Sequence, residues 1–466
     1  MYFCGPTVYS DSHVGHGKAY ITADIVHRYL EFLGYNVTYV QNITDVGHMT
    51  DNDDVAGEDK LEVQSRKERK HPMAIAEFYT QRYYEDMDAL NIRRPDIAPR
   101  ATGHIIEQIE LIKELIAKGF AYESEGNVYF DVAKDKEYGK LSGRKAEDQE
   151  ASGRVEERTD KRSPQDFALW KRAEKGHILQ WPSPWGMGFP GWHIECSAMS
   201  MKYLGETFDI HGGGLENQFP HHECEIAQSE CATGHPFVKY WMHNNMVTTG
   251  GVKMGKSLGN SAYLRDLYKQ YDPLSLRFTI LQSHYRGTTE FTTEAITSSA
   301  AGYRRLLDSI EALRTAVHTP LQTRILNEEE RQDPLVQRFI EAMDDDFNTA
   351  KAIAVLFEGL NELNTWIMGW INGPAVMGTE IEYRYQIWSN LAGSVLGILP
   401  TNQSSSSNES KKKDFALDKL VDSKKAERKA ARDRRDFAMS DSIRKELEEA
   451  GIILEDTKDG TAWRLK

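Results

Sequence analysis

Cysteines, long apolar runs and excess positive charge are all scarce in this sequence. No run of roughly 18 or more apolar residues occurs, so no membrane-spanning helix is predicted. The N-terminus has no basic stretch followed by an apolar core, which argues against a secretory signal. A low cysteine count in a chain with no secretory signal indicates a reducing cytoplasm. There, cysteine binds metals or takes part in catalysis more often than it forms disulfides. The 466 residues include four cysteines: Cys4, Cys196, Cys224 and Cys231.

The charge balance is acidic. There are 57 Lys and Arg against 71 Asp and Glu, a net charge of −14, which excludes a uniformly basic nucleic-acid coat, so any contact with nucleic acid must be local. Apolar residues make up 40% and charged residues 27%, fractions typical of globular rather than disordered chains. The length suggests about three domains. We therefore expect a soluble, multidomain cytosolic protein.

The first 40 residues have the pattern of a βαβ unit. The short apolar run 1–4 predicts a buried strand, and apolar side chains between Ile21 and Leu33 recur with the period of one helix face. Gly34 is a natural helix stop, and residues 37–40 predict the next strand. Such a unit belongs to a parallel sheet, whose ligands bind beyond the carboxyl ends of the strands.

The rest of the chain alternates between helical and strand-like segments. The acidic residues 47–60 predict an exposed loop, and residues 118–185 resemble an inserted domain with short strands. Most of the segment between Tyr303 and Leu396 is amphipathic and predicts a helical bundle. The other expected elements are helices at 73–90, 105–117 and within 415–450, strands at 128–130 and 208–211 (the latter followed by a glycine loop), a Ser-rich flexible linker at 401–413, and a strand-like end that contains Trp463.

His13-Val14-Gly15-His16 stands where the first strand gives way to a helix. The free N–H groups of a helix's first turn attract phosphate, and two imidazoles about one turn apart can donate hydrogen bonds to the same group. Gly15 lets a nucleotide approach the backbone closely. Taken alone, the tetrapeptide favours the simpler interpretation, a pair of exposed histidines that cap an ordinary helix.

A second motif, Lys253-Met254-Gly255-Lys256-Ser257, follows the apolar stretch 240–247. Two lysines three residues apart on a glycine-containing loop suit a leaving group whose negative charge grows during phosphoryl or nucleotidyl transfer. Alone, the segment would be a solvated basic turn. An N-terminal HxGH combined with a KMxKS-like loop across an α/β region is far more informative than either motif.

With these motifs and six further segments, the chain resembles the class I aminoacyl-tRNA synthetases, and in detail the cysteinyl-tRNA synthetases. The resemblance implies a split Rossmann catalytic domain with a connective insertion, followed by an α-helical bundle and a small C-terminal α+β anticodon-binding module. The segments span almost the whole chain in the family's order: MYFCGPTVY (1–9), HVGH (13–16), NITD (42–45), GWHIECSAM (191–199), FDIHGGG (208–214), FPHHECEIAQS (219–229), KMGKSLGN (253–260) and MDDDFNT (343–349).

The resemblance also divides the chain into expected domains. They are the first Rossmann half at 1–95, the connective insertion at 96–185, the second Rossmann half at 186–245, a stem-contact region with the KMGKS loop at 246–298, the bundle at 299–400, the linker at 401–413 and the anticodon-binding module at 414–466.

Spacing alone indicates a metal site only weakly. His221 and Glu225 would share a helix face if a helix begins after Pro220, but buried cysteines and a capping histidine explain these residues as well. The resemblance implies one Zn²⁺ per chain. Its ligands would be Cys4, Cys196, His221 and Glu225, with His222 and Cys224 as competitors. A thiophilic ion binds a thiolate strongly and a hydroxyl weakly, and so separates cysteine from serine without a proofreading domain.

The same resemblance implies the reaction and its contacts. Mg·ATP would activate L-cysteine to cysteinyl-adenylate, and the terminal ribose of tRNA(Cys) would then take the aminoacyl group. Thr44, Trp192 and His211 would contact the cysteine, although Trp192 could equally be a core aromatic. The implied catalytic residues are His13, His16, Lys253 and Lys256. The implied ATP contacts are His13, Gly15, His16, Gly212 and Lys256.

Positive charge gathers in the C-terminal segment, between Lys411 and Arg435. Such a patch attracts phosphate, and an aromatic side chain can stack on an unpaired base; a solvated helix face above a packed tryptophan is the alternative. We expect a cytoplasmic monomer with no membrane contact, whose partners are tRNA(Cys), ATP and L-cysteine. The anticodon contacts that the resemblance implies are Arg432, Phe437, Asp441, Asp456 and Trp463.

Some features depart from the usual pattern of the family. Gly255 stands where the loop more often has serine, and Glu216 and Asn217 stand where an aspartate and an apolar residue are usual. The chain also starts at its first strand without the family's short leading segment, so we expect a misassigned start codon or a missing edge element.

Two alternative functions remain open. Residues 414–466 argue against an enzyme that joins cysteine to an amino sugar, and the intact motifs argue against a non-catalytic tRNA-binding protein.

Overall fold

The computed structural model describes two compact units, Met1–Leu399 and Pro400–Lys466. The described residues are 1–47, 59–144, 160–249, 251–253, 262–316, 324–372 and 378–400, single positions between 424 and 447, and the strands 452–457 and 460–465. Among them, no helix combines the length and apolar character needed to cross a membrane.

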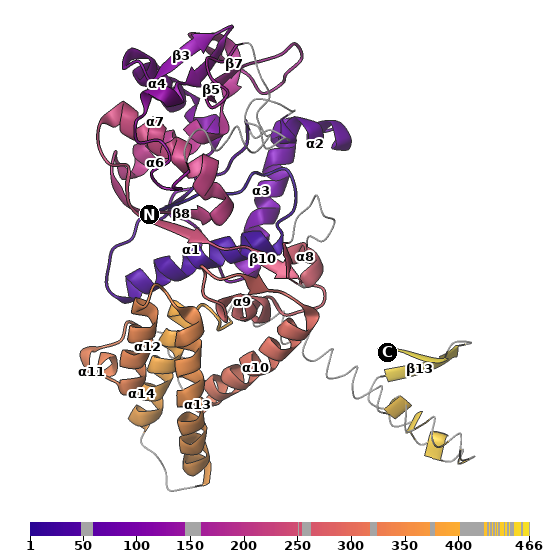
Figure 1. The fold of residues 1–466 in the computed structure, drawn as a ribbon. Coiled ribbons are helices and arrows are strands. Elements are labelled where there is room, and N and C mark those ends of the chain that lie inside the picture. The colour runs from indigo at the N-terminus through magenta and orange to yellow at the C-terminus, as the bar shows by residue number, and fades with distance from the viewer. Residues whose placement is uncertain are drawn as a thin grey trace. The chain divides into compact units, whose positions relative to one another are not determined.

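A four-stranded parallel sheet organises the first unit (Figure 1). Its order is β2-β1-β8-β9, and Tyr2 of β1 pairs with Val40 on one side and His211 on the other. Helix α1 connects β1 to β2, so the predicted βαβ unit is confirmed. Strand β2 begins only at Val40, the last residue of the predicted strand 37–40. The bounds are β1 Tyr2–Phe3, α1 Val14–Phe32, β2 Val40–Gln41, β8 Phe208–Gly214 and β9 Val238–Asn244.

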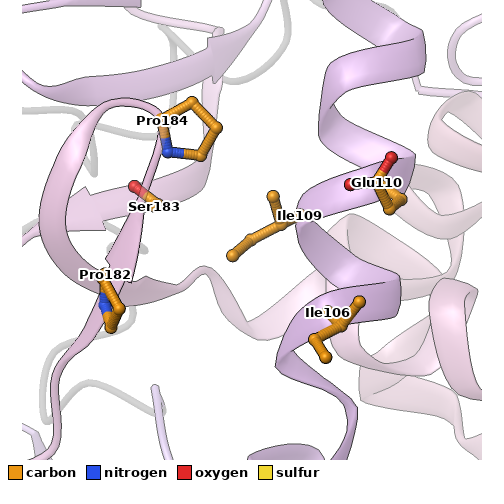
Figure 2. Close-up of a pocket in the computed structure, with 6 residues that line it drawn as sticks. All are labelled: Ile106, Ile109, Glu110, Pro182, Ser183 and Pro184. Atoms are coloured by element: carbon orange, nitrogen blue, oxygen red, sulfur yellow. The ribbon is translucent and has the colours of Figure 1, made fainter.

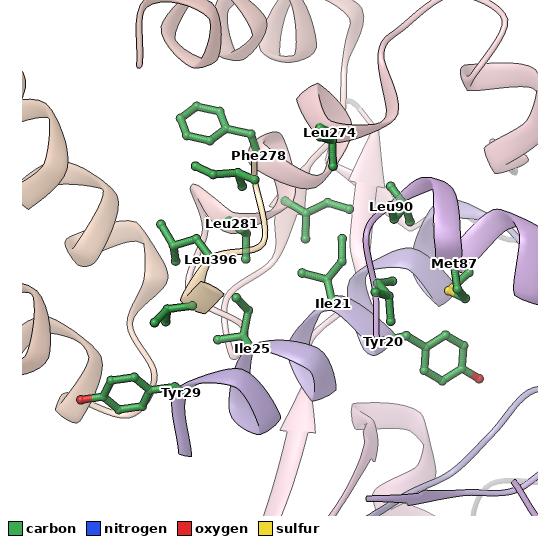
Figure 3. Packing of buried hydrophobic residues seen from close by; sticks show 14 of the residues in the cluster. Tyr20, Ile21, Ile25, Tyr29, Met87, Leu90, Leu274, Phe278, Leu281 and Leu396 are labelled. Atoms are coloured by element: carbon green, nitrogen blue, oxygen red, sulfur yellow. The ribbon is translucent and has the colours of Figure 1, made fainter. Parts of the chain in front are cut away.

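Helix α1 is buried around nearly its whole circumference. Its apolar side chains Ile21 and Ile25 pack toward Leu281 and Leu396 (Figure 3). The helix ends at Phe32 with Leu33 as its C-cap, and Gly34 takes a positive φ of 96°, as the sequence predicts for a helix stop. Because both faces are covered, α1 fixes its own N-terminus relative to the sheet and to the helices that follow.

An insertion with its own antiparallel sheet interrupts the parallel sheet, as the sequence predicts. Its five strands have the order β3-β4-β5-β7-β6. The predicted helices at 73–90 and 105–117 are confirmed, whereas α2 was not predicted. Of the predicted acidic loop 47–60, residues 48–58 lie outside the described residues. The bounds are α2 Lys60–Glu68, α3 Pro72–Ala89, α4 Ile105–Ala117, β3 Ala121–Ser124, β4 Asn127–Phe130, β5 Phe167–Arg172, β6 Trp181–Ser183, β7 Gly186–Pro190, α6 Trp192–Leu204 and α7 Glu223–Thr233.

A small three-stranded sheet leads into the predicted helical bundle, which is confirmed. The sheet order is β11-β10-β12. The bundle follows it in the chain and occupies the lower part of Figure 1. The bounds are β10 Val247–Thr249, β11 Val252–Lys253, α8 Leu264–Leu267, α9 Pro273–Leu281, β12 Thr289–Glu290, α10 Thr293–Ala316, α11 Glu328–Arg331, α12 Pro334–Asp344, α13 Thr349–Asn372 and α14 Gly378–Trp388, with a π-helical segment at Ser389–Val395.

The second unit ends in an antiparallel hairpin. Strand β13 (Ile452–Thr457) pairs with β14 (Gly460–Leu465), and Leu454 lies opposite Trp463. The strand-like end predicted around Trp463 is therefore confirmed. The predicted linker 401–413 lies outside the described residues.

Candidate functional site

Cysteine, histidine and glutamate side chains from three segments meet at one end of the parallel sheet. Cys4 follows β1, Cys196 lies in α6, and His221 and Glu225 flank the start of α7; α6 and α7 lie side by side (Figure 1). One potential ligand atom from each of the four lies within 4.8 Å of the others. The structure therefore brings together the whole donor set that the family resemblance implies.

The local backbone at α7 explains how His221 and Glu225 meet. Residues Gln218–His222 form a kinked turn in which Phe219 departs from helical geometry (φ −143°, ψ 128°), and α7 begins at Glu223. The turn still places the two side chains on one face, with His221 Nε2 3.1 Å from Glu225 Oε1. The predicted pairing is confirmed.

The donor types fit a zinc ion. Thiolate, imidazole and carboxylate groups all bind zinc, which can expand from four to five ligands when a substrate binds. Nδ1 of His221 contacts Nδ1 of His193 at 2.7 Å, which leaves Nε2 for the ion. That Nε2 is buried and, among the described residues, has no partner in hydrogen-bond geometry even though Glu225 is near, as expected for two ligands of one ion.

A second, overlapping donor set combines Cys4 and Glu225 with His211 and His222. Nε2 of His222 is 3.4 Å from Cys4 Sγ, and its Nδ1 is 2.8 Å from His243 Nε2. His222 therefore remains a competitor, as the sequence left open. We favour the set with two cysteines because thiolates are the ligands that zinc prefers.

Cys224, the other competitor, belongs to neither donor set. Its Sγ is 3.5 Å from Tyr138 Oη, and its side chain packs in the core between the insertion and α7. The interpretation of Cys224 as a small buried hydrophobe fits this position.

The charges of the donors depend on one another. Burial opposes ionisation of Glu225, yet His211 and His221 outweigh it and lower the pKa of this carboxyl to about 2. Burial likewise opposes the charge on His221, but Glu225 and Cys196 raise its pKa to about 9. A hydrogen bond from Cys4 lowers the pKa of Cys196 to about 6 despite burial. Glu225 and Cys196 therefore favour their deprotonated forms, whereas His221 favours its protonated form and burial beside Cys196 and Glu225 raises the pKa of the Cys4 thiol. Binding of a cation would release the protons of His221 and Cys4.

Aromatic rings surround the donors. The Trp192 ring stacks on His221 with centroids 4.2 Å apart, and His211 stacks on Trp241 at 4.6 Å. His211 Nε2 also contacts Glu225 Oε2 at 2.8 Å. The structure therefore brings Trp192 and His211 to the donor set, whereas their predicted contact with cysteine stays a prediction.

Thr44, the third predicted cysteine contact, lies just beyond β2. Its backbone bridges to Thr7 after β1, and its Oγ1 accepts a hydrogen bond from Asn42 Nδ2 at 2.9 Å. It is thus held at the carboxyl end of the strand next to β1, the end at which Cys4 lies.

The first motif forms the N-terminus of α1. His13 is the N-cap residue: its Nδ1 accepts from Gly15 N at 3.1 Å, while His16 Nδ1 accepts from His13 N at 3.2 Å. The two rings stack with centroids 3.8 Å apart. Because each Nδ1 accepts a hydrogen bond, each neutral ring carries its proton on Nε2 and can donate it to an anion. The histidines both cap the helix and offer donors.

The chain segment that follows the second motif is hydrogen bonded to the first motif. Lys253 ends β11, opposite Thr248 of β10, so it belongs to a strand rather than to the predicted loop; Gly255 and Lys256 lie outside the described residues. Beyond them, Val14 N donates to Ala262 O at 3.0 Å, and Leu264 N donates to Ser12 O at 2.9 Å.

Gly212 has a packing role that sequence reasoning missed. The glycines after His211 belong to β8 rather than to a loop, because the strand continues beside β9 to Gly214. A β-carbon at Gly212 would lie 2.3 Å from the Phe3 ring. Glycine is therefore required here by Phe3, whatever else approaches the strand.

The predicted anticodon contacts are described only in part. Arg432 and Phe437 lie outside the described residues, and Asp441 is exposed. Asp456 and Trp463 lie on the two strands of the terminal hairpin, so the backbone brings these two positions close together.

Sequence reasoning also missed His193, Trp241 and His243. His193 directly follows Trp192 in a quoted motif, and this adjacency is the signal that could have found it.

A shallow groove of about 330 Å³ lies elsewhere, between α4 and β6, where Ile109 faces Ser183 and the flanking prolines (Figure 2). None of the predicted site residues lines it.

Comparisons with known proteins identify the family of the chain. A family model of the tRNA synthetases class I (C) catalytic domain matches residues 1–301, and a DALR domain matches residues 338–399. The chain is 52% identical over 473 residues to "Cysteine--tRNA ligase" of Chlorobaculum tepidum, and the alignment covers 100% of this chain and 94% of that protein. It is 51% identical over 471 residues to the protein of the same name from Deinococcus radiodurans, with 100% and 92% covered.

Among solved structures, the chain is similar in fold to the Mycobacterium tuberculosis methionyl-tRNA synthetase in complex with methionyl-adenylate. The TM-score is 0.56 at 15% identity, over 84% of this chain and 89% of that chain. The predicted fold class, a Rossmann-type class I catalytic domain with an insertion and a helical bundle, is confirmed. With half its residues identical to those of full-length relatives, the chain belongs to the cysteine–tRNA ligase family of class I synthetases.

Proposed function

We propose that this chain ligates L-cysteine to tRNA(Cys) in two steps through cysteinyl-adenylate, with zinc selecting the substrate thiolate. One observation carries the proposal: the donor set Cys4, Cys196, His221 and Glu225, of which all but the half-buried Cys4 are buried, lies in the same unit as the capped histidine pair at the start of α1. A thiol-selective site and a phosphate-binding helix start are the two parts that cysteine activation needs.

The four donors would hold one zinc ion per chain. When bound, zinc supplies a soft cation that takes a thiolate strongly and a hydroxyl weakly. Trp192 and His211 support the donors by stacking and hydrogen bonding, and with Thr44 they would contact the amino acid. Selection at this stage requires no proofreading domain.

In the first step, a carboxylate oxygen of cysteine attacks the α-phosphorus of Mg·ATP. The bond from this phosphorus to the β-bridging oxygen breaks, and pyrophosphate leaves with the electron pair. Nε2 of His13 and of His16 would donate to the phosphate, and Gly15 would allow its approach. Lys253 and Lys256 would stabilise the charge on pyrophosphate. Gly212 would then lie near the adenosine only through its backbone, since Phe3 occupies the side on which a β-carbon would stand.

In the second step, the terminal ribose hydroxyl of tRNA(Cys) attacks the carbonyl carbon of the adenylate, and AMP leaves. The C-terminal unit would bind the anticodon through Arg432, Phe437, Asp441, Asp456 and Trp463. We further propose a cytoplasmic monomer. All four cysteines lie in the described residues and none forms a disulfide, which is consistent with a reducing compartment. The seven expected domain ranges also remain predictions.

ATP–pyrophosphate exchange tests the proposal. We expect exchange that depends on cysteine and is not supported by serine, followed by charging of tRNA(Cys). Absence of exchange would favour a non-catalytic tRNA-binding protein. Exchange without charging, together with transfer to an amino sugar, would favour the small-molecule ligase.

A further inference from the structure

Lys18 is a buried lysine on α1, two residues after His16. Its side chain is 1% exposed, and Nζ donates to Gly287 O at 2.6 Å and to Met246 O at 3.4 Å. Among the described residues, no carboxylate lies within ion-pair distance of it. Because burying an ammonium group is costly, two carbonyl contacts without an acidic partner call for an explanation.

The two carbonyl groups precede the strands of the small sheet. Met246 directly precedes β10, and Gly287 lies two residues before β12. These strands pair in parallel, with Val247 opposite Thr289, while β10 pairs on its other edge with β11, where Thr248 lies opposite Lys253. The Lys18 ammonium therefore joins the helix of the first motif to the base of the sheet that carries Lys253.

The same helix start holds the chain on the other side of the second motif. Val14 N donates to Ala262 O and Leu264 N donates to Ser12 O, and His13 forms a backbone bridge with Tyr263. The segments before and after the second motif are thus both attached within the first turns of α1.

We propose that Lys18 is a positioning residue for cysteine activation, in which its ammonium sets the separation between the histidine pair and the strand that ends at Lys253. The inference rests on the proposed function. Lysine suits this role because its long stem reaches both carbonyls from one α-carbon and its ammonium has three donors. Burial lowers its pKa to about 8, so it stays mainly protonated near neutral pH.

A small cavity beside Lys18 makes a conservative substitution feasible. Its volume is about 20 Å³, and Thr22, Ser283 and Tyr285 help to line it. That is room for about one water molecule, or for part of the larger head of an arginine. Lys18→Arg keeps charge and donors, whereas Lys18→Met keeps only the length of the stem.

The test compares these variants in cysteine-dependent ATP–pyrophosphate exchange. For Lys18→Met we expect kcat to fall roughly 10- to 100-fold, because small displacements of reacting groups have effects of that size. KM for cysteine and the zinc content should stay as in wild type. Lys18→Arg should recover most of kcat. Thr22→Val, which alters the same cavity without touching the ammonium contacts, should behave as wild type.

Hydrogen–deuterium exchange gives a readout that does not need activity. In Lys18→Met we expect the amides of β10 to exchange about tenfold faster, since local opening is read directly by this method, while β8 is unaffected. If Lys18→Met does not fold, Lys18→Gln, which is too short to reach both carbonyls, takes its place.

Two results would overturn the inference: unchanged kcat with unchanged β10 exchange, or an equal loss in kcat and in cysteine affinity that arginine does not relieve. If wild type shows no cysteine-dependent exchange, the proposed function fails, and the catalytic role of Lys18 fails with it. Faster β10 exchange in the variant would then show a purely structural contact.

Discussion

Replacing His193 by leucine should weaken zinc binding without removing a ligand. His193 is fully buried, and its Nδ1 contacts His221 Nδ1 at 2.7 Å. This contact fixes the ring of His221 and engages one of its nitrogens, so that Nε2 is presented to the ion. Leucine has a similar volume but offers neither a donor nor an acceptor.

The size of the effect follows from this one contact. A buried hydrogen bond contributes about 0.5–1.5 kcal/mol, and leaving its partner unsatisfied costs about 1–3 kcal/mol. Loss of an orienting group behind a metal ligand typically lowers affinity by about 10- to 100-fold, or about 1.4–2.8 kcal/mol. Both routes give the same range, so we expect Kd for zinc to rise by about one to two orders of magnitude.

The assay is competitive titration of the metal-free protein with zinc against a chelating indicator. His104→Leu is the matched control: His104 is also buried and hydrogen bonded, to Arg100 O at 2.7 Å and Tyr203 Oη at 2.8 Å, but it contacts none of the donors. Both variants should lose thermal stability, and only His193→Leu should lose zinc affinity. Equal zinc affinity in wild type and His193→Leu, or equal losses in both variants, would refute the reasoning.

Three further predictions concern other parts of the chain. His13→Ala should lower exchange activity by about 100-fold and, through loss of the cap to Gly15 N, stability by about 0.5–2 kcal/mol; wild-type exchange rates would contradict the phosphate role. Gly212→Ala should lower the free energy of unfolding in urea by about 1–3 kcal/mol, because its β-carbon overlaps Phe3; a neutral result would contradict the packing role. Burial raises the pKa of Asp86 to about 7 even though Arg265 opposes the shift. The native state therefore keeps a proton that the unfolded chain releases near pH 4. Stability should then fall by about 2–4 kcal/mol as pH rises from 4 to 8, and urea titrations of Asp86→Asn should lack this component; identical pH profiles would contradict it.

Local periodicity was enough to predict the elements that frame the site. The strand, helix and strand of the first 40 residues, the stop at Gly34 and the helix α4 all follow from apolar spacing and glycine, which act over a few residues. These features need no knowledge of the remainder of the chain.

The convergence of the donors could not be predicted from spacing. Cys4 follows strand β1 and Cys196 lies far along the chain in helix α6. Only the parallel pairing of β1 with β8 and the packing of α6 on α7 bring them together. Family resemblance supplied this set, because the motifs carry tertiary information that composition and period lack.

The burial of polar side chains on α1 could not be predicted from the sequence either. A helical pattern alone would place the polar side chains of Asp24 and Lys18 in solvent. In the structure, Arg277 of α9 packs beside Asp24, and the small sheet packs beside Lys18. Such partners come from residues far along the chain, so a helical pattern alone predicts an amphipathic surface helix.

X-ray absorption at the zinc edge tests the central claim most directly, because it counts the sulfur neighbours of the ion. The purified protein should hold one zinc with two sulfurs at about 2.3 Å, supplied by Cys4 and Cys196. Saturating L-cysteine should raise the count to three, and L-serine should leave it at two. A count that stays at two with cysteine, or purified protein without zinc, would contradict the account.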